Sequence, residues 1–189
     1  MANLDRYIVT VETMKHRVFQ FLPAEILPDN MLTVVALADA FHLGVLLSRF
    51  HVAWALHAGG WLGVGNDPRY SKSRCFDPFP FPSATDLQRQ RISSIAEDLD
   101  AHRMRVIAEH PRLTLTGLYN VLEKLRTGAS PDALDARDRR IFDDGLVLIL
   151  MELHDRLDAA VADLFACDEV RSGSRQSMPT ITSDALMTA

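Results

Sequence analysis

The sequence predicts an α+β fold, in which a small, mostly antiparallel β domain with an embedded helix precedes a segment of three helices. Short runs of alternating apolar residues, typical of strands, are confined to the beginning of the chain, whereas apolar residues at helical spacing dominate after residue 83. A proline-rich stretch, Phe76–Pro82, separates the two patterns. We therefore expect a first domain at 1–82, a helical segment at 83–165 and a disordered tail at 166–189, where the chain becomes polar and aperiodic.

Three segments of the first domain have the alternating pattern of strands. They are Arg6–Glu12, Arg17–Pro23 and Met31–Leu37. The connection between the first two is short enough for a hairpin, which favours antiparallel pairing. From Asp39, a residue type that caps helices well, the apolar period becomes helical, and Gly59 and Gly60 are typical of a helix end. This pattern predicts one helix between Asp39 and Gly59.

The rest of the first domain is expected to be irregular. The segment Trp61–Arg74 contains Gly63, Gly65 and Pro68, all of which interrupt helices. Three prolines within Phe76–Pro82 force an extended path. We therefore expect a loop, or a strand followed by a loop, and then an extended strut that leads out of the domain.

The second half of the chain predicts three helices. The first begins at Thr85 or Asp86 and ends at His110, because Pro111 follows. A short second helix ends at Gly128. The third follows a capped start in "SPDALDARDRR" (Ser130–Arg140), is long and reaches about Phe165, with a stripe of leucines that begins at Leu146.

The amino-acid composition limits the classes of function that the chain can have. The chain has 189 residues, of which 48% are hydrophobic and 24% charged, which is ordinary for a globular protein. Two cysteines and no CxxC motif argue against a disulfide framework or a zinc site, and favour a reducing, cytoplasmic setting. The sequence contains neither an apolar run of about 18 residues nor a signal-peptide pattern, so we expect no membrane partner.

The net charge of −5 by itself argues against a nucleic-acid partner. The charge is unevenly distributed, however. Residues 1–82 contain seven Lys or Arg and seven Asp or Glu, so the whole acidic excess belongs to residues 83–189. A DNA-facing surface in the first domain therefore remains compatible with the composition.

Several patterns suggest catalysis but lack the context that catalysis needs. The stretch Asn66–Tyr70 resembles the catalytic loop of amino-group DNA methyltransferases, yet Arg69 stands where that loop has a second proline. The glycines of Gly63–Gly65 are not followed by a helix, as a phosphate cradle requires. The pair Ser48 and His51 lacks an acid to orient the histidine, and Glu152–Asp158 lacks metal-ligand spacing. A self-contained enzyme is therefore the weaker hypothesis.

A cluster of cations and hydroxyls within Arg69–Arg74 is the best candidate for binding. Flexible cations suit phosphate groups, and an aromatic side chain suits a base or sugar. The residues that we expect to contact DNA are Arg69, Tyr70, Lys72 and Arg74, joined by Arg49 and His51 from the preceding helix. Lys15, His16 and Arg17 are weaker candidates for the same surface. The alternative is a merely solvated loop.

Three stretches carry a resemblance to a known family. They are "LLSRFHVAW", "PRY" with the following "CFDPFPFP", and "GLYNVLEKLR". They resemble the C-terminal part of large MmeI-like class I DNA methyltransferases of the combined restriction–modification type, over roughly residues 4 to 164. The resemblance implies a target-recognition domain at 1–82 that reads double-stranded DNA, followed by the helical C-terminal segment of those proteins.

The resemblance also implies what lies elsewhere in such enzymes. Their N-terminal part binds S-adenosylmethionine (SAM) and holds the catalytic loop, and no stretch of this sequence matches those motifs. We therefore expect a target-recognition fragment of an adenine-specific methyltransferase, with no cofactor or catalytic residue of its own, that serves a methyltransferase catalytic domain in cis or in trans. Two alternatives stay open, namely an interaction module whose acidic helices dock a partner, and a non-functional remnant.

Overall fold

The computed structural model describes residues 4–62 and 67–172. A three-stranded antiparallel sheet opens the chain, with β1 (Arg6–Val11) between β2 (Gln20–Pro23) and β3 (Leu32–Val35). Six helices of α type follow within the described residues, so the predicted α+β class is confirmed. The second strand is shorter than predicted, because Arg17–Phe19 precede it without joining the ladder.

The predicted single helix after Asp39 is wrong, because the chain forms two helices that meet at Ser48. They are α1 (Ala40–Leu47) and α2 (Arg49–Ala58). Ser48 has extended backbone angles and is fully buried. Its hydroxyl accepts from the backbone N–H of His51 and donates to the carbonyl of Val45, so it caps the start of α2. A local capping preference therefore interrupts a stretch in which apolar residues recur at helical spacing.

The segment Trp61–Arg74, predicted to be a loop or a strand followed by a loop, forms most of a two-stranded antiparallel ribbon. Its strands are β4 (Gly60–Leu62) and β5 (Asp67–Arg69), and a short π-helix, η1 (Lys72–Phe76), follows. The predicted extended strut is correct only beyond η1, where residues 80–85 have no regular secondary structure. The side chain of Phe79 is buried and its ring lies 4.5 Å from that of His51, so the strut is anchored in the core.

The helical segment contains four α-helices in place of the predicted three. They are α3 (Asp86–Glu109), α4 (Leu115–Arg126), α5 (Ala136–Asp144) and α6 (Val147–Ser172), with a 3₁₀ turn, η2 (Pro131–Ala133), before α5. The predicted third helix is split at Gly145 and Leu146, and Leu146 has a positive φ of 46°. Helix α6 also continues past the expected start of the tail, while residues 173–189 lie outside the described residues.

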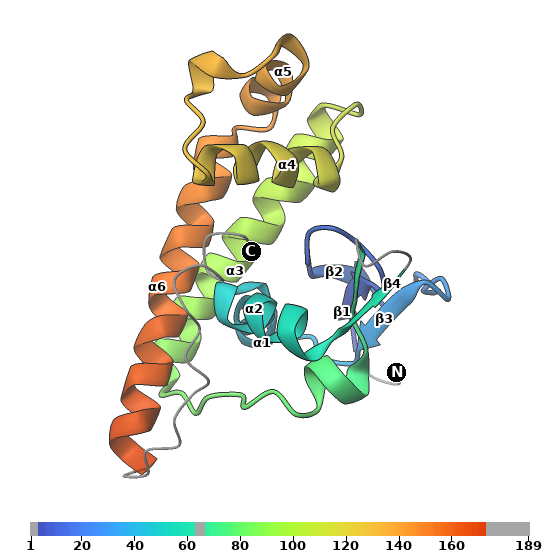
Figure 1. The fold of residues 1–189 in the computed structure, drawn as a ribbon. Helices are drawn as coiled ribbons and strands as arrows, with labels where there is room; N and C mark the ends of the chain where they lie inside the picture. Colours follow the sequence, from blue (N-terminus) through green and yellow to red (C-terminus); the bar gives the residue numbers. More distant parts are fainter. Residues whose placement is uncertain (1–3, 63–66, 173–189) are drawn as a thin grey trace.

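One hydrophobic core unites the two predicted domains. Helices α3 and α6 lie side by side along the molecule, α1 packs against both, and α4 and α5 lie at one end (Figure 1). A side chain at Gly44 of α1 would place its Cβ 2.6 Å from a methyl group of Ile92 in α3, so glycine allows this close approach. Within the described part of the chain, none of the helices combines the length and apolar character needed to cross a bilayer.

A buried polar network joins the sheet side to the helices. The guanidinium of Arg103, 1% exposed, donates to the carboxylate of Asp100, to the carbonyl of Phe19 and to the hydroxyl of Tyr119. The hydroxyl of Tyr119 also lies 2.8 Å from Nε2 of His154 on α6. A buried charge is stable only when it is paired and hydrogen-bonded. The network therefore joins the segment directly before β2 to α3, α4 and α6.

Candidate nucleic-acid interface

The β4–β5 ribbon and η1 carry three of the predicted DNA contacts as exposed cations, namely Arg69, Lys72 and Arg74. The backbone of β5 reaches the sheet through a bridge between Thr13 and Arg69 and through the bond from the N–H of Tyr70 to the carbonyl of Glu12, 2.8 Å long. The ribbon is thus held to the segment that follows β1.

Two of the three cations already have carboxylate partners. Arg69 pairs with Glu12, and Lys72 lies 2.7 Å from the carboxylate of Asp77. The side chains of Arg69 and Lys72 are 49% and 72% exposed, so these pairs contribute little to stability and phosphate groups can compete for the cations. No hydrogen bond or ion pair links Arg74 to any residue within 4–62 or 67–172.

The ribbon's register brings Arg69 and Arg74 to one face. Arg69 is the cross-strand partner of Gly60, and directly opposed residues share a face of the ladder. A Cβ at Gly60 would lie 3.9 Å from a guanidinium nitrogen of Arg74. Arg69 and Arg74 therefore both lie on the face of the ribbon that carries Gly60, and both side chains are exposed.

Tyr70 does not fulfil its predicted role, because its side chain is 1% exposed. Its hydroxyl lies 3.0 Å from Nε2 of His51, and its ring meets that of Phe19 edge to face at 5.3 Å. Burial raises the pKa of the phenol well above its ordinary value, which keeps it neutral. The prediction that Tyr70 stacks on a base is therefore corrected: this residue anchors the ribbon in the core.

His51 is likewise a core residue, with no exposed surface. Burial, followed by the charge of Arg17, lowers the pKa of His51 to about 3, so the imidazole is neutral at physiological pH. The prediction of a DNA contact is corrected here too. The imidazole instead packs against the rings of Phe19, Tyr70 and Phe79.

Arg49 is exposed but belongs to a different part of the surface. Its guanidinium lies 3.1 Å from the carboxylate of Asp158 on α6, and its backbone N–H donates to the same carboxylate over 2.8 Å. Burial raises the pKa of Asp158, while the hydrogen bond and charge of Arg49 oppose that shift. This pair fastens α2 to α6, and the structure does not place Arg49 beside the ribbon.

Arg17 positions the ribbon, a role that the sequence analysis missed. Its buried guanidinium donates to the hydroxyl of Thr10 and to the carbonyls of Val11, Glu12 and Pro68. Burial lowers its pKa to about 10, so it stays charged. The available signal is the position of Arg17 directly before the largely apolar run Val18–Leu22, since charged residues are rarely buried without partners.

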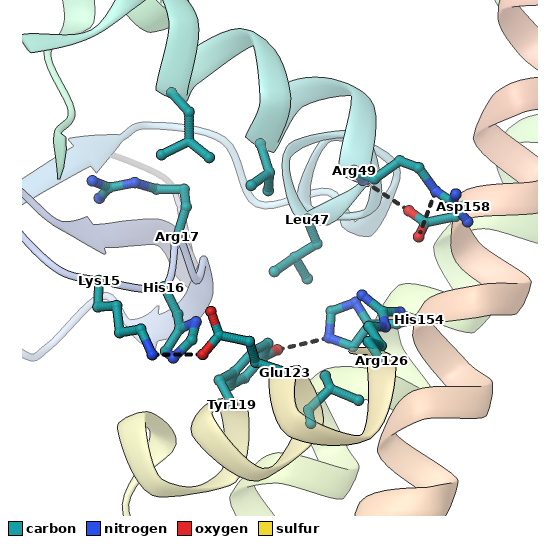
Figure 2. Close-up of a pocket in the computed structure, with 13 residues that line it drawn as sticks. Lys15, His16, Arg17, Leu47, Arg49, Tyr119, Glu123, Arg126, His154 and Asp158 are labelled. Atoms are coloured by element: carbon teal, nitrogen blue, oxygen red, sulfur yellow. Dashed lines mark hydrogen bonds and ion pairs between the residues drawn. The ribbon is translucent and has the colours of Figure 1, made fainter. Parts of the chain in front are cut away.

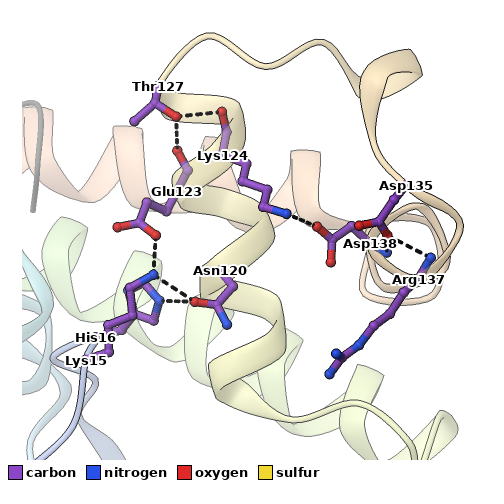
Figure 3. A network of polar contacts seen from close by, with 9 residues as sticks. All are labelled: Lys15, His16, Asn120, Glu123, Lys124, Thr127, Asp135, Arg137 and Asp138. Atoms are coloured by element: carbon purple, nitrogen blue, oxygen red, sulfur yellow. Dashed lines mark hydrogen bonds and ion pairs between the residues drawn. The ribbon is translucent and has the colours of Figure 1, made fainter.

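A separate cavity of about 90 Å³ lies where the β1–β2 connection, α2, α4 and α6 meet (Figure 2). Its cations are already paired within the chain, Lys15 with Glu123 at 2.5 Å and Arg126 with Asp155 at 2.9 Å. Figure 3 shows that the weaker candidates Lys15 and His16 bind Glu123 and Asn120 of α4. These residues therefore fasten the sheet side to the helical segment.

The sheets of the described residues differ from the scaffold of a Rossmann-like cofactor site. A Rossmann-like cofactor site needs a parallel sheet with a glycine-rich turn between a strand and a helix, whereas this sheet is antiparallel. Of the suggested catalytic loop, Asn66 lies outside the described residues, and Pro68 and Tyr70 are buried. No group of three or more His, Cys, Asp or Glu within the described ranges is placed to hold a metal ion.

Comparison with known proteins gives a consistent result. Residues 7–83 match the family described as "MmeI, target recognition domain". DNA methyltransferase A of Bacillus subtilis (strain 168) is 33% identical over 98 residues, which are 51% of this chain and 10% of the relative. This chain thus spans about a tenth of that relative's length.

The fold also has a counterpart among solved structures. The Type IIL restriction–modification enzyme MmeI, solved in complex with DNA, superposes with a TM-score of 0.61 at 21% identity. The superposition covers 85% of this chain and 18% of MmeI, so the likeness in fold extends beyond the matched domain into the helices. The family match and this shared fold together confirm the resemblance to MmeI-type target recognition domains over residues 7–83.

Proposed function

We propose that this chain binds double-stranded DNA as the target-recognition part of an adenine-specific, SAM-dependent DNA methyltransferase of the restriction–modification type. Catalysis and SAM binding belong to a methyltransferase catalytic domain that acts with it in cis or in trans, in the cytoplasm. The observation that carries the proposal is the pair of exposed guanidinium groups, Arg69 and Arg74, on one face of a ribbon inside the matched domain. Arginine on an open β ribbon is a common way to grip phosphate groups.

The salt dependence of DNA binding tests this proposal. The triple variant Arg69→Ala, Lys72→Ala and Arg74→Ala is expected to bind a duplex at least about tenfold more weakly, with a salt slope reduced by roughly two to three, because fewer counterions are released. Fluorescence anisotropy of a labelled duplex at several salt concentrations measures both quantities.

A matched control distinguishes loss of a binding site on the ribbon from a general effect of the changed net charge. Arg91, Arg139 and Arg140 lie on the exposed surface of α3 and α5, and replacing all three with Ala changes the net charge equally. This control is expected to keep most of the affinity. Equal losses in both triple variants would contradict the assignment of the ribbon, and the absence of duplex binding by the wild-type chain would contradict the function itself.

A second function, docking of a partner protein, has one observation in its favour. Three apolar side chains at the start of α6 are exposed, namely Leu146 (42%), Leu148 (50%) and Ile149 (44%). Contiguous exposed apolar residues are typical of interaction surfaces. A stable complex with a methyltransferase catalytic domain, lost in Leu148→Glu, would support this function; it is compatible with DNA binding at the ribbon.

A further inference from the structure

The β4–β5 ribbon exposes a large aromatic side chain, that of Trp61. Trp61 is 54% exposed, and its neighbour Leu62 is 41% exposed. Tryptophan is usually mostly buried, because its ring removes a large apolar area from water. Two adjacent exposed apolar residues on a ribbon that already carries cations therefore point to a ligand with both apolar and anionic groups.

The register separates these groups onto the two faces of the ribbon. Trp61 pairs with Pro68, whereas the neighbouring pairs Gly60–Arg69 and Leu62–Asp67 point to the opposite face. The guanidinium of Arg74 lies over Gly60 and so joins Arg69. Trp61 is therefore on one face, and the two arginines are on the other.

The base of the ribbon is rigidly held while its side chains stay exposed. Arg17 donates to the carbonyl of Pro68 over 3.1 Å, and Tyr70 directly after β5 is buried. Strand β4 leads from α2 toward the side of the molecule that carries the sheet (Figure 1). Holding an exposed strand in place before a ligand arrives lowers the entropic cost of binding.

Given the proposed function, we infer that the β4–β5 ribbon enters the major groove of double-stranded DNA, where Trp61 contacts base edges while Arg69 and Arg74 hold the phosphate groups. The major groove admits a two-stranded ribbon, whereas the minor groove is about half as wide. Apolar side chains in the major groove contact the methyl group of thymine, so Trp61 contributes to sequence preference. Trp61 takes over the aromatic role first assigned to Tyr70, which is buried.

Single variants of the full chain distinguish the two kinds of contact. The probe is the duplex pool that the wild-type chain enriches from random sequence. Trp61→Ala is expected to weaken binding about fivefold or more with an unchanged salt slope, because an apolar contact releases no counterions. Arg74→Ala is expected to lower the slope by about one. Leu87→Ala, at an equally apolar residue that is 77% exposed on α3, is the control and should bind like wild type.

The enriched sequences give a second readout. Trp61→Ala is expected to relax the selected motif at one or two base pairs, whereas Arg74→Ala is expected to enrich the same motif as wild type. Trp61→Phe should select the same motif as wild type. If Trp61→Ala melts at a lower temperature than wild type, Trp61→Phe is compared with wild type in its place. Prior addition of distamycin, a minor-groove ligand, should leave the affinity unchanged.

The outcomes separate this inference from the function on which it rests. Unchanged affinity and motif in Trp61→Ala, together with weakened binding in the triple cation variant, would overturn the inference and leave the function intact. Displacement by distamycin would overturn the groove assignment. No enrichment and no binding by the wild-type chain would refute both.

Discussion

At the scale of single residues, several side chains that the sequence suggests as DNA contacts are buried and hold the candidate interface in place. His51, Tyr70 and Arg17 form a buried cluster beneath the ribbon, with the guanidinium of Arg17 5.1 Å from the centre of the Tyr70 ring. His51 and Tyr70 are neutral, and Arg17 is satisfied by carbonyls and a hydroxyl. These residues determine where the exposed arginines lie without meeting a ligand themselves.

The neutral state of His51 predicts how stability depends on pH. In the fold its pKa is about 3, whereas an unfolded histidine titrates near 6.5. Between these values unfolding takes up one proton, so the contribution of His51 to stability falls as the pH is lowered. We expect the free energy of unfolding of His51→Gln to fall less steeply with acid than that of wild type, by about 1.4 kcal/mol per pH unit.

Urea denaturation at several pH values between about 6 and 4 measures this difference. Comparing the two slopes cancels the contributions of other groups, such as Asp158, that both proteins share. Parallel curves for the two proteins would mean that His51 takes up no proton on unfolding, and would contradict its neutral state in the fold.

At the scale of secondary-structure elements, two breaks in apparently continuous helices create the architecture. Ser48 ends α1 and caps α2, and Gly145 separates α5 from α6. A Cβ at Gly145 would lie 2.2 Å from a methyl group of Leu118 and 2.6 Å from the carbonyl oxygen of Ile141. The second contact is with backbone, which cannot rotate away, so glycine is needed for α5 to fold back on α4.

Gly145→Ala is therefore expected to destabilise the chain by about 1–3 kcal/mol through overpacking. Gly60→Ala is the matched control, because its Cβ would meet only the end of the Arg74 side chain at 3.9 Å. The control should change stability by less than about 0.5 kcal/mol. Thermal or urea unfolding of both variants gives the comparison, and equal stabilities would show that the α5–α6 turn tolerates a side chain.

At the scale of the whole molecule, the recognition domain and the helical segment depend on each other. Arg6 of β1 lies 2.5 Å from Glu97 of α3, and Arg103 of α3 donates to the carbonyl of Phe19. The buried face of α1 packs on α3 and α6. The match at residues 7–83 thus marks a recognition unit whose core is completed by residues outside it.

Residues 1–82 expressed alone are therefore expected to remain largely unfolded, because α1 and the sheet would expose apolar surface that α3 and α6 cover in the full chain. The full chain should unfold in one cooperative transition. Far-UV circular dichroism and the chemical-shift dispersion of NMR spectra test both statements. A dispersed spectrum from the fragment, with duplex affinity equal to that of the full chain, would contradict this dependence.

The α+β class, the capped start of α3 at Thr85 and the cation-rich segment at Arg69–Arg74 all follow from the sequence, because local periodicity and capping are properties of neighbouring residues. Burial is not such a property. Only the tertiary structure decides that Tyr70 and His51 face inward, that Arg69 and Arg74 share a face, and that Trp61 stays exposed. These outcomes depend on contacts between segments far apart in the chain, such as Arg17 with Pro68, and no local pattern encodes them.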